Sequence, residues 1–199
     1  TTPTVFAGTT LSRPVLLAPQ WIAPVAPEPG VLTGHAVVID GTRIAALAPL
    51  AQAQQEFPDA ETVPLPGHLL TPGFINLHSH AAMALLRGAA DDLPLQQWLH
   101  ERIWPLEAEL VDADFVHDGA LLACRELLLG GVTCINDMYF YPQACARAAL
   151  TLGMRSVQGI VVIDSPTRYA SSPADYLRKG LELRDQLRGE SRVSFALAP

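Results

Sequence analysis

The sequence predicts an α/β fold in which a small β domain precedes a parallel sheet covered by helices. Residues 12–71 hold short apolar runs broken by glycine, proline and aspartate, whereas residues from 73 onward alternate strand-like and helical segments. Nearly continuous apolar strands that alternate with helices are typical of parallel sheets with both faces covered. A hydrophobic share of 49% with 17% charged residues indicates a globular chain and excludes a disordered one.

Residues 1–71 are predicted to form the small β domain. Its candidate strands are residues 15–18, 21–25, 35–40 and 43–48. Asp40-Gly41 separates the last two, and this pair favours the tight turn of a β-hairpin. The open edges of such a sheet are expected to pair with further strands.

Residues 72–199 are predicted to form four βα units. The apolar strands are residues 73–77, 132–138, 155–163 and 193–198, and the helices are residues 114–129, 142–152 and 172–189. A doubly wound sheet and a (β/α)8 barrel share this half-pattern. The chain has no glycine-rich phosphate loop after its first strand, which disfavours a nucleotide-binding doubly wound sheet. A complete barrel takes roughly 250 residues, so the chain would carry the first half of one.

Charge and composition exclude several classes of partner. The net charge is −7 and no cluster of lysine or arginine exists, so we expect no nucleic-acid partner. No uncharged apolar run reaches the ~20 residues that span a bilayer, and residues 1–12 lack the pattern of a secretory signal. The three cysteines, Cys124, Cys134 and Cys145, form no CxxC motif and are expected to be reduced core thiols. We therefore expect a cytoplasmic protein with no membrane partner.

Two histidines form the sharpest chemical signal in the chain. His78 and His80 stand two positions apart at the C-terminal end of the first predicted barrel strand. Residues i and i+2 of a strand point to the same face, so the two imidazoles converge as a metal site requires. A lone HxH pair is a weak signal, but barrels place their chemistry at the carboxyl ends of their strands. The pair is therefore predicted to bind a metal ion.

The residues around this pair resemble a known family. The run TPGFINLHSH at residues 71–80 is similar to the first-strand motif of the amidohydrolase superfamily. The segments LLRG at 85–88, WL at 98–99, WPLE at 104–107 and DMYF at 137–140 resemble the branch that deaminates 5′-methylthioadenosine and S-adenosylhomocysteine. The resemblance covers essentially the whole chain. It implies the first half of a (β/α)8 barrel preceded by a small β-sandwich domain that both chain ends build.

The same resemblance implies hydrolytic deamination that depends on one zinc ion, with iron or manganese as alternatives. Zinc on neutral imidazoles activates water for attack on purine C6, and ammonia leaves. In the superfamily the other metal ligands and a glutamate that shuttles protons come from later strands, beyond Pro199. The chain is therefore expected to hold no catalytic residue of its own and to be inactive without the C-terminal part. We further expect a homo-oligomer.

Two residues are expected to contact the nucleoside substrate. The residue that matches Glu107 accepts hydrogen bonds from the ribose diol in the related branch, which suits a carboxylate because it has two acceptor oxygens. Trp98 would form a wall of the pocket, whereas Trp104 is expected in the core. Ungapped alignment places Ile160 where members that bind homocysteine-bearing nucleosides have arginine. A missing guanidinium leaves a carboxylate without its partner, so the sequence favours methylthioadenosine over S-adenosylhomocysteine.

Other interpretations stay open at this point. One alternative is another branch of the superfamily, that of guanine or cytosine deaminases or triazine hydrolases. The substrates of those enzymes have no ribose diol for Glu107 to bind, which argues against this alternative. A non-catalytic fragment that needs a C-terminal partner is an alternative of a different class. A structural role and a role in the site are both open for Asp137 and Arg87. The remaining histidines are expected at the surface or in packing: His35, His68, His100 and His117.

Overall fold

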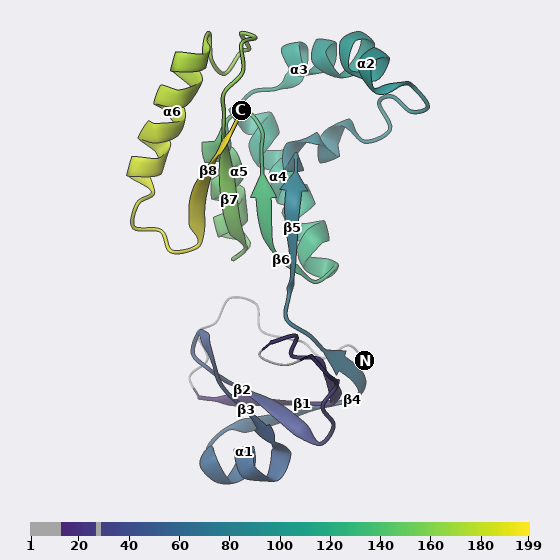
Figure 1. Ribbon diagram of the computed structural model, residues 1–199, viewed down its shortest axis with the longest axis vertical. Helices are drawn as coiled ribbons and strands as arrows, with labels where there is room; N and C mark the ends of the chain where they lie inside the picture. Colours follow the sequence, from purple (N-terminus) through teal and green to yellow (C-terminus); the bar gives the residue numbers. More distant parts are fainter. Residues whose placement is uncertain (1–12, 27–28) are drawn as a thin grey trace. The chain divides into compact units, whose positions relative to one another are not determined.

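The structure is a computed structural model that describes residues 13–26 and 29–199 (Figure 1). The chain divides into two compact units, Thr1–Pro72 and Gly73–Pro199. The prediction that residues 1–12 carry no secretory signal falls outside the described residues. Within the part that the structure describes, no helix combines the length and the apolar character needed to cross a membrane.

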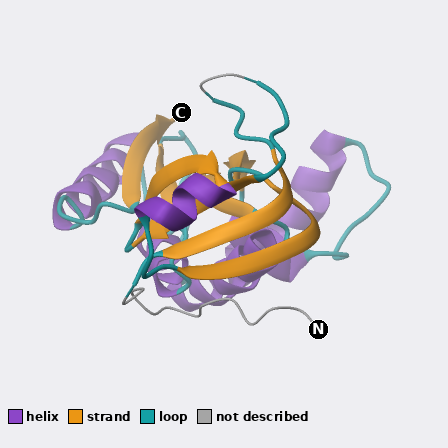
Figure 2. Cartoon of the chain, turned by 90° about the horizontal axis from the view of Figure 1, so that it is seen from below, coloured by secondary structure: helices purple, strands orange, loops and turns teal. Residues whose placement is uncertain are grey.

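The first unit is built on one mixed sheet. Its strands are β1 (Val15–Ile22), β2 (His35–Asp40), β3 (Arg43–Pro49) and β4 (Glu61–Leu70), and they lie in the order β3-β2-β1-β4. Figure 2 shows helix α1 (Leu50–Glu56) lying across these strands. The contact between helix and sheet is a small apolar core of buried side chains: Leu16, Ala36, Val38, Ala48 and Ala53.

The predicted hairpin is confirmed, but one predicted strand is wrong. Strands β2 and β3 pair antiparallel up to Asp40 and Arg43, and Gly41 turns the chain with a φ of 56°. Residues 21–25 do not form a strand of their own, because β1 runs without a break through Pro19 to Ile22. Proline has no N–H for the ladder, and the register with β4 shifts between Pro19 and Trp21.

Helix α1 and strand β4 are not among the elements that the sequence predicts. Strand β4 contains Pro64, Pro66 and Gly67, which read as strand breakers. Prolines are tolerated there because β4 is an edge strand and pairs on one side only. In residues 13–26 and 29–72 the strands form a single sheet, so the second sheet of a sandwich is not among them and the sandwich stays a prediction.

The second unit contains four parallel strands in sequence order, as predicted. They are β5 (Phe74–Ser79), β6 (Val132–Asp137), β7 (Arg155–Val161) and β8 (Val193–Ala198). The connecting helices are α4 (Ala113–Leu129), α5 (Pro142–Thr151) and α6 (Pro173–Gln186) (Figure 1). Each helix begins at a residue suited to that place: Asp112 caps α4 with its side chain, Ser172 caps α6, and a proline opens α5.

The main core lies where α4 and α5 cover the sheet. Its members include small residues that let the helices approach closely: Ala81, Ala82, Ala120, Ala123, Ala144, Ala148 and Ala149. Gly119 of α4 contacts the helical segment that follows His80. A Cβ added at Gly119 would lie 2.4 Å from the carbonyl oxygen of Ala82. This close approach holds the segment after His80 against α4.

A helical insert separates β5 from α4. It begins with the 3-10 helix η1 (Ala81–Leu86) and continues through α2 (Leu95–Trp98), the π-helical η2 (Leu99–Ile103) and α3 (Trp104–Leu110). The Trp104 N–H donates to the Leu99 carbonyl, five residues back. Pro105 follows, and its ring cannot be placed against the carbonyl of residue 101 without a clash. The wider π turn relieves this crowding and carries the helix on into α3.

Gly119→Ala is expected to lower the free energy of unfolding by about 1–3 kcal/mol, because the added methyl group clashes with backbone. Alanine is favoured over glycine in a helix by about 1 kcal/mol, so the clash must outweigh that gain. Urea denaturation measures the difference. The matched control is Gly189→Ala, where no atom lies within 4 Å of the added Cβ. A stabilised Gly119→Ala protein would contradict the close packing.

Candidate functional site

The two predicted metal ligands meet at the end of β5. The Nε2 atoms of His78 and His80 lie 3.2 Å apart. Their ring centroids are 4.9 Å apart and the planes are nearly perpendicular, at 88°. The alternation of side chains along a strand produces this convergence, as the spacing of the two residues predicts.

A hydrogen bond from the neighbouring strand orients the second histidine. The Nδ1 atom of His80 lies 2.6 Å from the carbonyl oxygen of Met138, just after β6. A carbonyl only accepts, so Nδ1 carries the proton and Nε2 keeps its lone pair for a ligand. Metal-binding histidines are commonly oriented in this way by a carbonyl or carboxylate on their other nitrogen.

The donor pair fits a divalent metal ion. Two nitrogens on a tetrahedral zinc ion, each at ~2.0–2.1 Å, lie about 3.3 Å apart, and the observed separation is 3.2 Å. Among the described residues, no group of three or more histidine, cysteine, aspartate or glutamate side chains gathers around a common point. This part of the chain therefore offers two ligands.

Asp137 is a buried residue that holds the chain directly after the histidine pair. It ends β6 with 2% of its surface exposed, and its Oδ1 accepts a hydrogen bond of 2.6 Å from the N–H of Ala81. Burial raises the pKa of the Asp137 carboxyl above its ordinary value, against the opposing effect of the Ala81 N–H. The contact fixes the start of η1 directly after His80. The structure thus shows a structural role for Asp137.

Glu107 and Tyr139 connect the histidine pair to a cavity. Tyr139 donates a hydrogen bond of 2.7 Å to Oε1 of Glu107 on α3. The Tyr139 ring centroid lies 6.3 Å from that of His80. Burial raises the pKa of Glu107, while the hydrogen bond from Tyr139 and the proximity of His80 lower it. Burial and the neighbouring Glu107 also raise the pKa of Tyr139, so its hydroxyl remains a donor.

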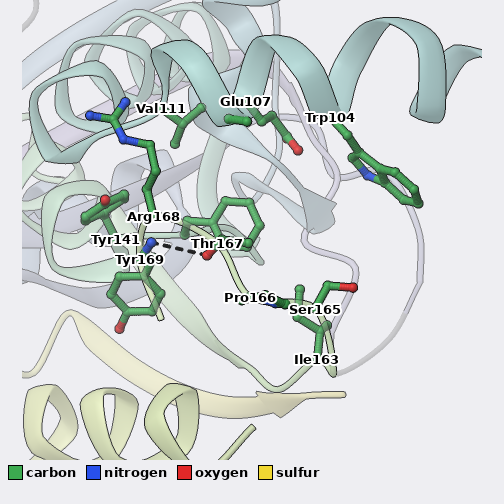
Figure 3. A pocket seen from close by; sticks show the side chains of 12 residues that line it. Trp104, Glu107, Val111, Tyr141, Ile163, Ser165, Pro166, Thr167, Arg168 and Tyr169 are labelled. Carbon is green, nitrogen blue, oxygen red and sulfur yellow. Dashed lines mark hydrogen bonds between the residues drawn. The ribbon is translucent and has the colours of Figure 1, made fainter. Parts of the chain in front are cut away.

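A cavity of about 610 Å³ lies between α3 and the loops that follow β6 and β7 (Figure 3). Cavities of ~300–1,000 Å³ are typical of small-molecule sites. Aromatic and apolar side chains dominate its wall, and Glu107 and Arg168 supply the charged groups. The lining residues are Trp104, Glu107, Ala108, Val111, Phe140, Tyr141, Ile163, Ser165, Pro166, Thr167, Arg168 and Tyr169.

One lining residue has an unusual backbone. Tyr141 has a φ of 52° and a ψ of 52°, in the left-handed region that non-glycine residues seldom occupy. It directly precedes Pro142, which disfavours the right-handed helical conformation at residue 141. The turn directs the Tyr141 ring toward Tyr169, with 5.1 Å between the centroids. Strained residues of this kind are frequent at binding sites.

Comparison with known proteins assigns the family. The pattern of the amidohydrolase family matches residues 69–199. The chain belongs to the amidohydrolase family. It is 44% identical over 185 residues to a 5-methylthioadenosine/S-adenosylhomocysteine deaminase of Saccharophagus degradans, covering 93% of this chain and 42% of that protein. A protein of the same name from Teredinibacter turnerae is 43% identical over 180 residues, covering 90% of this chain and 41% of that protein. The chain therefore spans about two fifths of the length of these relatives.

Solved structures of amidohydrolase type agree with this assignment. A zinc-bound adenosine deaminase from Xanthomonas campestris is 38% identical with a TM-score of 0.82, and the match covers 93% of this chain and 42% of that one. A zinc-bound atrazine chlorohydrolase from Arthrobacter aurescens has a TM-score of 0.81 at 20% identity, covering 92% of this chain and 46% of that one. The second likeness shows the fold alone.

The amidohydrolase site differs from the sequence prediction in its tryptophans. Trp104, expected in the core, is 46% exposed and lines the cavity. Trp98 is not among the lining residues, and its Nε1 donates to the carbonyl of Ala90 at 3.1 Å. Trp104 and Glu107 lie three positions apart and share a face of α3. Trp98 belongs to α2, which the π-helical segment separates from α3. The predicted substrate contact of Trp98 stays a prediction.

The expectation for Ile160 is wrong. Its side chain is 4% exposed and packs against α6, where a Cβ added at Gly180 would lie 2.2 Å from Ile160 Cγ2. Ile160 therefore faces a helix and does not line the cavity. Alignment without a gap identifies the position of residue 160 along β7, but it does not reveal which face of the sheet its side chain occupies.

Arg168 is the one cation among the residues that line the cavity, and no spacing in the sequence predicts it there. Its Nη1 donates to the carbonyl of Glu109 at 3.0 Å and joins the loop after β7 to the last turn of α3. Arg87, by contrast, forms an exposed ion pair with Glu126 at 2.7 Å and has a structural role. The four remaining histidines make only local contacts, as expected: His35 with Thr33, His68 with Pro66, His100 with Trp104 and His117 with Asp118.

Replacing both His78 and His80 by alanine in the full-length protein is expected to abolish tight metal binding, because two of the ligands disappear. Elemental analysis after dialysis measures the metal content. His117→Ala is the control, since that side chain lies on α4 and pairs with the neighbouring Asp118. Full metal occupancy in the double variant would refute the assignment.

Proposed function

We propose that the chain is the N-terminal part of a metal-dependent hydrolytic deaminase of adenine nucleosides that carry a 5′-thioether. The proposal rests on one arrangement: Glu107, at the wall of a largely apolar cavity, is connected through Tyr139 to the metal-type pair His78 and His80. The names of the relatives that are 43–44% identical support the same substrate class.

Each group in this arrangement has a task that its chemistry suits. His78 and His80 would hold the ion, with His80 kept in the required tautomer by the Met138 carbonyl. A divalent ion, zinc being the first candidate and iron or manganese the alternatives, supplies Lewis-acid activation of water when bound. Glu107 accepts hydrogen bonds from the ribose diol, and the aromatic wall packs on the apolar surface of the nucleoside.

The remaining ligands and the residue that shuttles protons are proposed to come from the C-terminal part of the protein. The outer strands of this sheet are β5 and β8. Ile75 and Leu77 of β5 are 62% and 74% exposed. Large apolar side chains exposed on one strand favour a further covering segment. We accordingly propose that residues 73–199 form the first half of a barrel and are inactive alone.

A different amidohydrolase branch is the second candidate. Guanine deaminase of E. coli has a TM-score of 0.77 at 18% identity, covering 92% of this chain and 45% of that one. That likeness supports the fold and carries no substrate preference. Glu107 disfavours this branch, because a free base or a triazine offers no diol to a carboxylate at the cavity wall.

The cavity wall also bears on which 5′ substituent the substrate carries. Ile160 is not among the lining residues and has no part in this preference. The cavity wall is mostly apolar, and its one cation among the described residues, Arg168, already donates to the Glu109 carbonyl. A homocysteine tail carries an ammonium as well as a carboxylate, and the one acid among the lining residues, Glu107, is assigned to the diol. The ammonium would therefore lack a partner, whereas a methylthio group needs none. We therefore propose a preference for methylthioadenosine over S-adenosylhomocysteine.

Glu107→Ala in the full-length enzyme is expected to lower kcat/KM for methylthioadenosine. The decrease should correspond to a loss of roughly 1–3 kcal/mol of transition-state stabilisation, as for a lost hydrogen bond to a charged group. The same variant should lose little on the 2′,3′-dideoxy analogue, where the contact is already absent. Steady-state ammonia release measures both. Glu109→Ala is the matched control, because that exposed side chain lies two positions along α3 and outside the cavity. Equal losses on both substrates would reject the diol contact.

The branch assignment is tested by assaying ammonia release from methylthioadenosine, S-adenosylhomocysteine, guanine and cytosine side by side. We expect turnover of the two nucleosides, with the larger kcat/KM for methylthioadenosine. Turnover of guanine or cytosine without either nucleoside would place the protein in another branch. A larger kcat/KM for S-adenosylhomocysteine would contradict the tail preference only.

A further inference from the structure

Tyr139 contacts Glu107 from the side that faces the protein. Tyr139 is 6% exposed and does not line the cavity, whereas Glu107 does. Its hydroxyl donates to Oε1 of Glu107 at 2.7 Å. Among the described residues, this is the one side-chain hydrogen bond that Glu107 receives. The contact joins the end of β6 to α3 across 32 positions of sequence.

The hydrogen bond leaves most of the carboxylate free for a ligand. An ionised carboxylate has two oxygens and about four acceptor sites. Tyr139 occupies one of these sites on Oε1. The opposite oxygen, together with the remaining site of Oε1, can accept two hydroxyl donors from the cavity side. A side chain held at one atom also loses less conformational freedom when it binds its ligand.

We propose that Tyr139 is a positioning residue, which holds the Glu107 carboxylate toward the cavity so that it accepts both hydroxyl groups of a ribose diol. Tyr139 itself does not touch the substrate. The inference rests on the proposed role of Glu107 and adds a residue that no motif in the sequence assigns to binding. The position of Tyr139 is in turn set by the carboxyl end of β6, two residues after Asp137.

The surroundings of Glu107 show how the phenol also affects its charge. Two groups act on its charge: the Tyr139 hydroxyl from the end of β6 and His80 from the end of β5. Arg168, elsewhere in the cavity wall, directs its guanidinium to the Glu109 carbonyl. Burial raises the pKa of Glu107, and the Tyr139 hydroxyl lowers it. Without the hydroxyl the pKa would rise further. The carboxylate would then become protonated, and lose acceptor capacity, at a higher pH than in the natural protein.

The first experiment compares Tyr139→Phe with the natural full-length enzyme. For nucleosides with a free diol we expect about a tenfold lower kcat/KM, mainly through KM, because the ring stays and only a hydrogen bond to a charged group is lost. The acid limb of the kcat/KM profile should move to higher pH. The 2′,3′-dideoxy analogue should show neither effect. In a Glu107→Ala background, Tyr139→Phe should have no further effect on the diol substrates.

Two results of this experiment would overturn the proposal. One is an equal loss on diol and dideoxy substrates, and the other is full additivity with Glu107→Ala. Either result would mean that Tyr139 supports the fold in general and does not act through Glu107.

A second measurement does not depend on activity. Carbon-13 NMR of the glutamate Cδ atoms, with Glu107→Gln to assign the signal, follows the titration of Glu107 in the full-length protein. Tyr139→Phe should raise the pKa of Glu107. Tyr176→Phe is the control: it also removes a buried phenol hydroxyl, but that hydroxyl contacts Thr167 and the Ser165 carbonyl, so the Glu107 titration should not change.

The two measurements separate the proposals. If the full-length protein deaminates no nucleoside, the proposed function fails, yet the NMR titration still tests the link between Tyr139 and Glu107. An unchanged Glu107 pKa in Tyr139→Phe would overturn the positioning role even in an active enzyme.

Discussion

The hydrogen bonds made by three consecutive residues at the end of β6 hold the candidate site together. Asp137 accepts from the Ala81 N–H, the Met138 carbonyl accepts from His80 Nδ1, and Tyr139 donates to Glu107. The parallel register, in which Ser79 lies opposite Asp137, brings these residues beside the end of β5. One short segment thereby sets the start of η1, the orientation of a metal-type histidine and the position of an acid on α3. Displacement of β6 would disturb all three contacts together.

This arrangement also separates two electrostatic environments. On the buried side of the site, burial raises the pKa of Asp137 and raises that of the Cys145 thiol well above its ordinary value. Gln158 donates a hydrogen bond to the sulfur of Cys145 there. Toward the cavity, the wall is mostly aromatic and apolar, and among its lining residues only Glu107 and Arg168 bring charge. A ligand that enters meets few fixed charges, and each of them therefore has a large influence on what binds.

The helical insert decides which side chains reach the cavity. Its π-helical segment ends at Ile103, two residues before Pro105, and α3 follows with Trp104 and Glu107 on one face. Trp98 lies before the segment and bonds to Ala90 in its own loop. The change in helix type at the proline is thus directly connected with the composition of the wall.

Sequence by itself determined the order of four parallel strands, the convergence of His78 and His80, and the family, because these depend on periodicity and on motifs of fixed spacing. It did not determine β4, whose prolines are acceptable only because the strand lies at an edge. Nor did it determine that Trp104 lines the cavity, that Ile160 faces α6, or that Tyr139 bonds to Glu107. Those contacts join residues that lie on separate elements or on one face of an element. Such contacts exist only once helix phase, strand register and packing have been set together by the tertiary structure.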